Sequence, residues 1–289
     1  MRRAHESWPS LSKTKDYVHH RKKVHSVAWA PNGAKLASAS VDHSARVWAI
    51  DTTGRSTDVE LRGHSDSVEH VRWHPTQPET LATVSADRTL RIWDARSAKC
   101  AQTVDTPAEN LSMRWSPDAT HIAVGDRNDV VSLVETRKCQ IMASWKFGGE
   151  VNEMAWQPDG RVFFVCCGEG VVKLFRFAEL LRNATDPSPA ADASLRGHTS
   201  TCYCIEFDAA AERFCVGGAD AVVSVWDLAE MVCLRTVTRL NYMVRTVSFS
   251  HDSAYIASSA DTTIDIAEAA TGKCALTIPC GAQLNSVAW

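Results

Sequence analysis

The sequence predicts an all-β fold made of repeated four-stranded units that pack side by side. A short pattern recurs along the chain, in which Gly197-His198 is followed by Asp220, 22 residues after the histidine, and then by Trp226-Asp227. A strand signature also ends on an aromatic residue at seven places: Trp29, Trp73, Trp115, Trp156, Phe207, Phe249 and Trp289. Their spacings are 44, 42, 41, 51, 42 and 40 residues, and self-similarity at such a period indicates a repeat architecture.

Each unit is expected to hold four short antiparallel strands. In the second unit, residues 69–73 alternate between polar and apolar side chains, and His74-Pro75 then marks a turn. Residues 90–94 form a further strand that carries the Trp-Asp pair, and residues 100–104 form a weaker outer one. Such units cannot bury both faces alone, so radial stacking into a propeller is expected.

Two segments depart from the repeat. Residues 1–19 lack it and carry Arg2, Arg3, Lys13 and Lys15, which indicates a basic, solvated N-terminal tail. A nuclear-targeting or phosphate-contacting patch is the alternative for these cations. The long step of 51 residues places a loop insertion near 179–194, where Asp186-Pro187-Ser188-Pro189 is a loop signal. Residues 20–289 are assigned to the propeller.

These units resemble the WD40 repeat over residues 20–289, in length and in their Gly-His and Trp-Asp pairs. In that family a His, a Ser or Thr, an Asp and the Trp form a buried hydrogen-bond chain inside a blade. The resemblance implies this network for His20, Ser40, Asp42 and Trp48; for His64, Ser85, Asp87 and Trp93; and for His198, Asp220 and Trp226, with Gly218 at the hydroxyl position. The other blades are degenerate: Asn128 and Val134, Glu169 and Phe175, and Ala267 replace the Asp and Trp positions, while Ser259 and Asp261 are kept.

Catalytic and metal chemistry is not expected. A recurring His–Asp–Ser set resembles a catalytic triad, but its repetition with a Trp in each blade favours a structural network. The sequence contains no Gly-x-Ser-x-Gly, His-Glu-x-x-His or Walker A motif. Its ten cysteines form no CxxC pair, and Cys100, Cys233 and Cys274 recur seven residues after the Trp position. We therefore expect small buried hydrophobes, with no cofactor and no metal.

Charge and hydropathy exclude two classes of partner. The formal net charge of −3 gives no global attraction to nucleic acid or to an acidic membrane surface. No stretch approaches the roughly 20 apolar residues of a membrane span, and no secretory pattern opens the chain. We expect a soluble intracellular protein without a membrane partner or a small-molecule substrate.

The segment from Asn285 to Trp289 repeats the first strand of a blade. Two interpretations follow. The favoured one is a seven-bladed propeller that is truncated at the C-terminus, with six recognisable blades and the first strand of a seventh. The other is a six-bladed ring in which this segment is a tail.

Several stretches are more specific than the repeat and resemble the WD40 subunit family of the THO complex. They are residues 22–29, 63–68, 89–94, 150–153, 227–233, 239–246, 248–253 and 260–268. The resemblance implies a nuclear, non-enzymatic scaffold that binds other THO/TREX subunits, contacts RNA indirectly at most, and couples transcription to messenger-RNA processing and export. Two alternatives stay open: an adaptor or substrate receptor of a ubiquitin ligase or chromatin complex, and a propeller enzyme or direct RNA binder.

A ring of residues stands four positions before the closing aromatics, where the first strand of each blade begins. These residues are His25, Glu69, Leu111, Asn152, Tyr203, Arg245 and Asn285, and Tyr242 lies nearby in sequence. The mixture of charge, amide and aromatic ring suits protein recognition better than an RNA track. We therefore predict a partner-binding rim at this end of the propeller, with satisfied strand ends as the simpler alternative.

Overall fold

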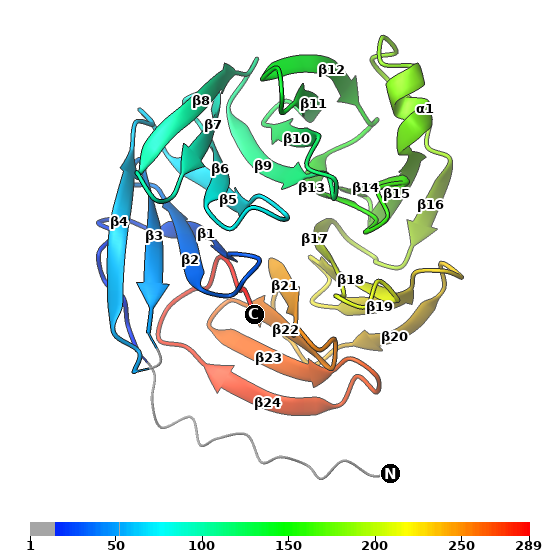
Figure 1. Cartoon of the computed structure of the whole chain (residues 1–289). Coiled ribbons are helices and arrows are strands. Elements are labelled where there is room, and N and C mark those ends of the chain that lie inside the picture. Colours follow the sequence, from blue (N-terminus) through cyan, green and yellow to red (C-terminus); the bar gives the residue numbers. More distant parts are fainter. Residues whose placement is uncertain (1–14, 52) are drawn as a thin grey trace.

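The computed structural model describes residues 15–51 and 53–289 as a ring of six four-stranded antiparallel sheets (Figure 1). The prediction of an all-β propeller with six recognisable blades is confirmed. Blades 1 to 3 comprise β1 (Val24–Trp29), β2 (Lys35–Ser40), β3 (Ser44–Ile50), β4 (Ser56–Arg62); β5 (Val68–Trp73), β6 (Thr80–Ser85), β7 (Thr89–Asp94), β8 (Lys99–Asp105); and β9 (Asn110–Trp115), β10 (His121–Asp126), β11 (Val130–Glu135), β12 (Gln140–Lys146).

The second half of the ring has one helix besides its strands. Blades 4 to 6 comprise β13 (Val151–Trp156), β14 (Val162–Cys167), β15 (Val171–Arg176), α1 (Phe177–Arg182), β16 (Ala193–Arg196); β17 (Cys202–Phe207), β18 (Arg213–Gly218), β19 (Val223–Asp227), β20 (Cys233–Val237); and β21 (Thr246–Phe249), β22 (Tyr255–Ala260), β23 (Thr263–Glu268), β24 (Cys274–Pro279). In each sheet the strands follow chain order from the innermost strand to the outermost (Figure 1).

Neighbouring inner strands are joined by a repeated hydrogen bond. The donor is the backbone N–H of the residue that lies two positions before the closing aromatic of one blade. The acceptor is a side chain of the preceding blade, on the residue three positions before the closing aromatic of that blade. Val71 N donates to Ser26 Oγ at 3.4 Å, and Met113 N donates to His70 Nδ1 at 3.0 Å. A short side chain at this inner position therefore satisfies a backbone donor of the next blade.

The segment from Asn285 to Trp289 lies between blade 6 and blade 1. Val287 N donates to Thr246 Oγ1 at 3.4 Å, and Ser286 Oγ accepts from Val27 N at 3.2 Å. Both bonds repeat the junction bond, so the segment occupies an inner-strand position in the ring, and the C-terminus lies inside the ring (Figure 1).

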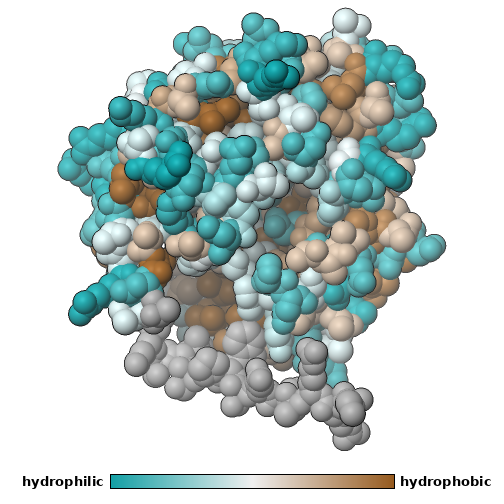
Figure 2. Space-filling view, viewed as in Figure 1, coloured by the Kyte–Doolittle hydropathy of each residue, from teal (hydrophilic) through white to brown (hydrophobic). Residues whose placement is uncertain are grey.

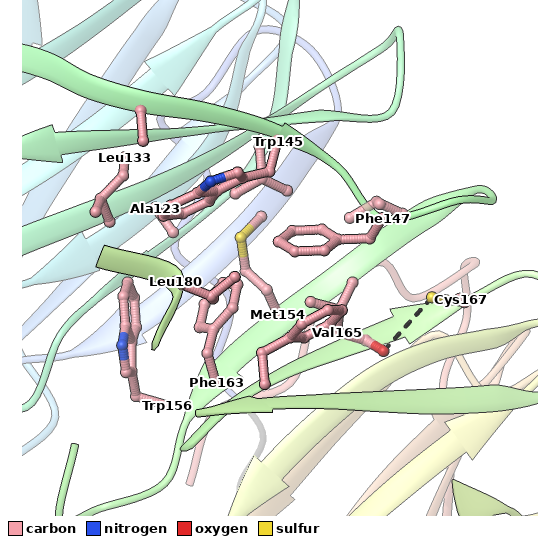
Figure 3. Packing of buried hydrophobic residues seen from close by; sticks show 14 residues of the cluster. Ala123, Leu133, Trp145, Phe147, Met154, Trp156, Phe163, Val165, Cys167 and Leu180 are labelled. Carbon is pink, nitrogen blue, oxygen red and sulfur yellow. Dashed lines mark hydrogen bonds between the residues drawn. The ribbon is translucent and has the colours of Figure 1, made fainter. Parts of the chain in front are cut away.

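The apolar core is divided among the junctions between blades. Where blades 3 and 4 meet, Trp145, Phe147, Met154, Trp156 and Phe163 are all buried and pack together (Figure 3). Side chains that alternate along each strand supply one face to each neighbouring blade. The ring is thus held by successive interfaces between sheets, as the repeat predicts.

The expected loop insertion at 179–194 is only partly a loop. The segment begins inside α1, whose Leu180 is buried in the core, and ends inside β16, the outer strand of blade 4. Phe177 of α1 also contacts Trp156 edge-on, with ring centroids 5.4 Å apart. Two apolar helix side chains thus reach the core, which a composition rich in Pro, Asp and Ser did not indicate.

Residues 15–19, which were assigned to the basic tail, lie against blade 1. Tyr17 Oη donates to the carbonyl oxygen of Gly54 at 3.1 Å, and the His19 ring lies 5.4 Å from the Trp48 ring. Tyr17 and His19 therefore hold this part of the segment against blade 1, although most of residues 15–19 are exposed. The rest of the tail prediction, including Arg2, Arg3 and Lys13, falls on residues outside the described ranges.

The cysteines at the recurring position are not buried, contrary to the sequence prediction. All ten cysteines are free thiols, and Cys233 and Cys274 are exposed while Cys100 is half-buried. Each of the three is the first or second residue of an outer strand and pairs with the residue at the Trp position, at the point where the strand register shifts. The outermost strand of a blade has solvent on one side, so this position is only partly covered.

Candidate functional site

The histidines, aspartates and tryptophans singled out in blades 1, 2 and 5 form hydrogen-bond chains that brace each blade. In blade 2, Trp93 Nε1 donates to Thr83 Oγ1 at 2.8 Å, and this hydroxyl lies 2.7 Å from His64 Nε2. His64 Nδ1 lies 2.8 Å from the Asp87 carboxylate. Because a carboxylate can only accept, Nδ1 carries the proton, and Nε2 accepts from the threonine hydroxyl.

The predicted role of Ser40 and Ser85 in these chains is wrong. The hydroxyl that links His to Trp belongs to Ser38 in blade 1 and to Thr83 in blade 2. Trp93 pairs across the ladder with Leu81, so Thr83 is its diagonal neighbour and Ser85 is one further step away. Ser85 instead donates to the Asp66 carbonyl oxygen at 3.2 Å and accepts from Asp87 N at 3.0 Å.

Blade 5 keeps the chain although Gly218 stands at the expected hydroxyl position. Ser224 supplies the hydroxyl, 2.8 Å from His198 Nε2, and accepts from Trp226 Nε1 at 2.7 Å. Asp220 lies 3.0 Å from His198 Nδ1. Ser224 pairs across the ladder with Val216, the residue at the Thr83 position, so the hydroxyl has moved to the adjacent strand.

Blades 4 and 6 replace the chain with other chemistry. In blade 4, Phe147 stands at the histidine position and Phe175 at the tryptophan position, with ring centroids 4.5 Å apart. In blade 6, the Arg239 guanidinium holds the buried Asp265 carboxylate through two bonds of 3.1 and 2.7 Å. The space for this ion pair arises because Ala267 replaces the tryptophan. The departures from the repeat therefore still produce braced blades.

The rim predicted from the sequence is a real cavity. Its volume is about 330 Å³, and it is lined by Lys23, His25, Glu69, Asn152, Tyr203, Arg245 and Asn285. Six of the eight residues named for the rim are therefore brought together from six different inner strands or strand entries. Leu111 lines a neighbouring, larger cavity instead. Tyr242 does not line the rim cavity; it is an exposed side chain on the loop that leads to β21.

Charged pairs order part of this rim. His25 Nδ1 lies 2.5 Å from the Glu69 carboxylate, and the Arg245 guanidinium lies 6.0 Å from the centre of the Tyr203 ring. Burial acts to raise the pKa of Glu69, but the hydrogen bonds with His25 and Ser67 and the nearby positive charge together outweigh it, and the pKa lies below its usual value. Glu69 is thus a carboxylate at neutral pH, and the rim presents fixed charges of both signs.

Below the rim a larger cavity of about 560 Å³ forms the central channel. Figure 2 shows the face of the ring hollowed near its centre. Arg72, Arg114 and Glu206, each directly before a closing aromatic, line the channel together with Glu153, three residues before its aromatic. Sequence reasoning missed these four residues, although the repeat register that located the rim would have found them.

Burial and like charge perturb the basic groups of the channel. Burial, followed by the neighbouring Arg114 charge, lowers the pKa of Arg72 to about 10. Burial and the two arginines also hold the pKa of His70 well below its ordinary value. His70 Nδ1 accepts the Met113 N–H, which requires that nitrogen to be unprotonated. At neutral pH the channel therefore holds charged arginines beside a neutral imidazole.

The described residues contain no cluster of three or more His, Cys, Asp or Glu side chains that could hold a metal ion. None of the helical structure in residues 15–51 and 53–289 has the length and apolar character needed to cross a membrane. The rim instead presents charged, amide and aromatic side chains in a ring, and such groups can recognise another molecule.

Comparison with known sequences places this ring in a family. The model of the THOC3 beta-propeller domain matches residues 20–289. The chain belongs to the THOC3 β-propeller family. The chain is 46% identical to "THO complex subunit 3" of Arabidopsis thaliana over 279 residues, which are 96% of this chain and 86% of that protein.

More distant relatives of this THOC3-family chain share the repeat. "WD repeat-containing protein AAC3" of Dictyostelium discoideum is 34% identical over 259 residues, covering 83% of this chain and 53% of that protein. "Anaphase-promoting complex subunit cdc20" of the same organism is 34% identical over only 100 residues, which are 34% of this chain and 20% of that protein.

Proposed function

We propose that this protein is a non-enzymatic scaffold subunit of the THO/TREX assembly. In that role it joins other THO subunits in the nucleus and helps to couple transcription to messenger-RNA processing and export. The observation that carries the proposal is the family match over residues 20–289, together with 46% identity to a THO complex subunit 3. The proposed partners are proteins, RNA is contacted indirectly, and no membrane or small-molecule substrate is involved.

The rim is the proposed contact surface for a protein partner. This proposal is supported by one cavity, which is lined by His25, Glu69, Asn152, Tyr203, Arg245 and Asn285. Interfaces draw much of their energy from aromatic and arginine side chains, and Tyr203 and Arg245 provide one of each. Tyr242, 61% exposed on the adjacent loop, is proposed to extend this surface.

We also propose that the ring has sevenfold rather than sixfold order. This proposal is supported by the junction bonds on both sides of Asn285–Trp289, which match those between blades 1 and 2. In a sevenfold ring the segment from Asn285 to Trp289 is the inner strand of a seventh blade.

Affinity purification of the full chain from nuclear extract, followed by mass spectrometry, tests the scaffold proposal. The other THO subunits should be recovered, and nuclease treatment should leave them bound because RNA is not the bridge. A matched purification uses Arg245→Glu, which reverses one rim charge without touching a blade brace.

A substrate receptor or adaptor in a ubiquitin ligase or chromatin complex is the alternative function. The partial similarity to an anaphase-promoting complex subunit favours it, but over only a third of this chain. Recovery of ubiquitin-ligase or chromatin subunits without THO subunits would select this alternative and contradict the scaffold proposal.

A further inference from the structure

We propose that the central channel contains a carboxylate-binding site formed by Arg72 and Arg114, with Asn152 as a third donor. This site is separate from the blade braces and lies deeper than the rim. The proposal concerns the ligand of the channel and does not depend on which assembly the protein joins.

Arg72 is the first observation behind the site. Its side chain projects into the channel from the inner strand β5, and it makes no hydrogen bond or ion pair with the described residues. Its Nε is shut off from solvent and has no acceptor. A buried N–H without an acceptor costs on the order of 1–3 kcal/mol, and more when the group is charged. A ligand that supplies an acceptor would recover that cost.

Arg114 provides a second set of donors from β9, the next inner strand. Its Nη2 lies 3.4 Å from Glu153 Oε2 and 3.6 Å from Glu206 Oε2, which are ion-pair contacts longer than normal charged hydrogen bonds. Its Nη1 is buried and has no acceptor. One edge of the Arg114 guanidinium is therefore balanced by carboxylates, while another edge is free to bind.

Asn152 completes the donor set on β13. Its Nδ2 is also buried without an acceptor, and the residue lines both the rim cavity and the channel cavity. Three neighbouring inner strands, β5, β9 and β13, thus each place an unpaired donor in the same cavity. The small residues Ala28 and Ala288 line the channel at the positions equivalent to Arg72 and Arg114, which leaves room beside the guanidinium groups.

The charges of the channel select the kind of ligand. The unpaired groups of Arg72, Arg114 and Asn152 are all donors, so they need an acceptor, which an ammonium or guanidinium ligand does not have. Glu153 and Glu206 oppose a phosphate dianion, since each adds a negative charge close to Arg114. A carboxylate group carries a single negative charge and two acceptor oxygens, and it matches the planar fork of an arginine. In a dicarboxylate the second charge is on a separate group several bonds away, so only one negative charge has to lie beside Glu153 and Glu206, whereas a phosphate dianion places both charges there.

Two sources can supply such a carboxylate. One is the aspartate or glutamate side chain of a protein segment that enters from the rim, where Tyr203 and Arg245 flank the opening. The other is a small organic dicarboxylate that fills the channel, whose volume of about 560 Å³ is adequate for either. The chemistry at Arg72 is the same in both cases.

Titration of the full chain labelled with ¹⁵N-arginine tests the site. Glutarate is added at constant ionic strength and pH 7, and the Nε–H signals of Arg72 and Arg114 are followed. A saturable shift of both signals is expected. Arg72→Gln should weaken glutarate binding at least about tenfold, which is the loss of one charged hydrogen bond. The matched control Arg62→Gln removes a surface guanidinium that is 75% exposed and should change the affinity by less than about twofold.

Glu206→Gln separates ligand binding from folding. Glu206 is 40% exposed, and its removal relieves repulsion and frees Arg114, so glutarate affinity should rise several-fold. A variant that merely disturbed the fold would lose affinity. Inorganic phosphate, titrated in the same way, should bind more weakly than glutarate.

Two peptides of otherwise equal sequence, one with a central glutamate and one with glutamine there, distinguish the sources. Tighter binding of the glutamate peptide than of glutarate identifies a protein segment, and binding of glutarate alone identifies a small carboxylate. The proposal is overturned if neither probe shifts the Arg72 signal saturably, if phosphate binds as tightly as glutarate, or if Arg72→Gln leaves the affinity unchanged.

Discussion

Blade 2 and blade 6 solve the same structural problem with different residues. In blade 2, Gly63 allows the Trp93 ring to approach the backbone, and the His64, Thr83 and Asp87 chain satisfies the buried polar groups. In blade 6, arginine stands at the glycine position and alanine at the tryptophan position. The guanidinium of Arg239 then reaches the Asp265 carboxylate through the space that an indole fills elsewhere.

In blades 2 and 5 the glycine allows a close approach of the tryptophan ring to the backbone. A Cβ on Gly63 would lie 3.3 Å from the Trp93 ring, and one on Gly197 would lie 2.4 Å from the Trp226 ring. In these two blades a larger residue at the glycine position would have to displace the indole. Blade 1 shows that this is not a general rule, because His19 stands at the same position and its ring lies 5.4 Å from that of the buried Trp48. Blade 6 has neither the glycine nor the tryptophan, and the Arg239–Asp265 ion pair braces it instead.

Truncation of the tryptophan in blade 2 should give the largest effect. Trp93 is almost fully buried and is the end of the hydrogen-bond chain. Trp93→Ala should destabilise the protein by about 3–5 kcal/mol in urea unfolding, because it creates a cavity and leaves Thr83 without its donor. Blade 6 already has alanine there and tolerates it. A loss below about 1 kcal/mol would mean that the indole is not the centre of the brace.

Removal of one partner of the blade 6 ion pair should cause the second-largest loss of stability. Asp265→Ala removes the carboxylate that accepts two charged hydrogen bonds from Arg239, whose side chain is 35% exposed and keeps its bond to the Gly272 carbonyl oxygen, and it should cost about 2–3 kcal/mol. The double variant Arg239→Met, Asp265→Leu should cost less than the single one, since no unpaired charge remains. The comparison of urea midpoints checks this, and an additive loss in the double variant would contradict the account.

The coupling of glycine to tryptophan should give a smaller effect. Gly197→Ala places a methyl group against the Trp226 ring and should cost about 1–3 kcal/mol through overpacking. The matched control is Gly281→Ala, where no atom lies within 4 Å of the new Cβ, and its effect should be within about 0.5 kcal/mol. Thermal unfolding of both variants measures the difference; equal shifts would disprove the coupling.

The stability of the two braces should also depend differently on pH, and this is the smallest of the expected effects. Burial lowers the pKa of His64, although the nearby Asp87 carboxylate acts to raise it. The unfolded chain therefore binds a proton at this histidine more readily than the folded one, so stability falls as pH drops below about 6.5. The hydrogen bond to Asp265 raises the pKa of Arg239, whose guanidinium stays charged throughout this range.

His64→Gln should therefore reduce the slope of unfolding free energy against pH between 7 and 5, by less than about 1.4 kcal/mol per pH unit. Arg239→Met should leave that slope unchanged. The pKa of Asp87 is lowered as well, but its contribution is lost only below about pH 4, outside this window. Urea unfolding at a series of pH values tests both variants, and an unchanged slope for His64→Gln would contradict the buried neutral imidazole.

Spacing along the chain predicted the fold and much of the rim, because inner strands at a regular period must place equivalent residues at one end of a ring. Spacing could not identify the hydroxyl of each brace, since Ser38 and Ser40 lie on the same face of one strand and only the register of the partner strand selects between them. It also missed Ser224, which acts from the neighbouring strand.

The channel site depended on contacts that no local pattern reveals. Arg114 meets Glu153 from the adjacent blade and Glu206 from the blade beyond it. Their proximity follows from closure of the whole ring around the channel. The Arg239 and Asp265 pair escaped for a similar reason, because its partners are 26 residues apart and no motif of the repeat pairs these two positions.

The central claim is that the histidine chains brace the blades while recognition takes place at the rim. Capture of THO subunits from nuclear extract by two variants, matched against their unfolding temperatures, tests it most directly. Arg245→Glu should lose partners at an unchanged unfolding temperature, and Thr83→Val should lower the unfolding temperature while partners are still captured well below it. Partner loss with Thr83→Val at full folding, and full capture with Arg245→Glu, would contradict the account.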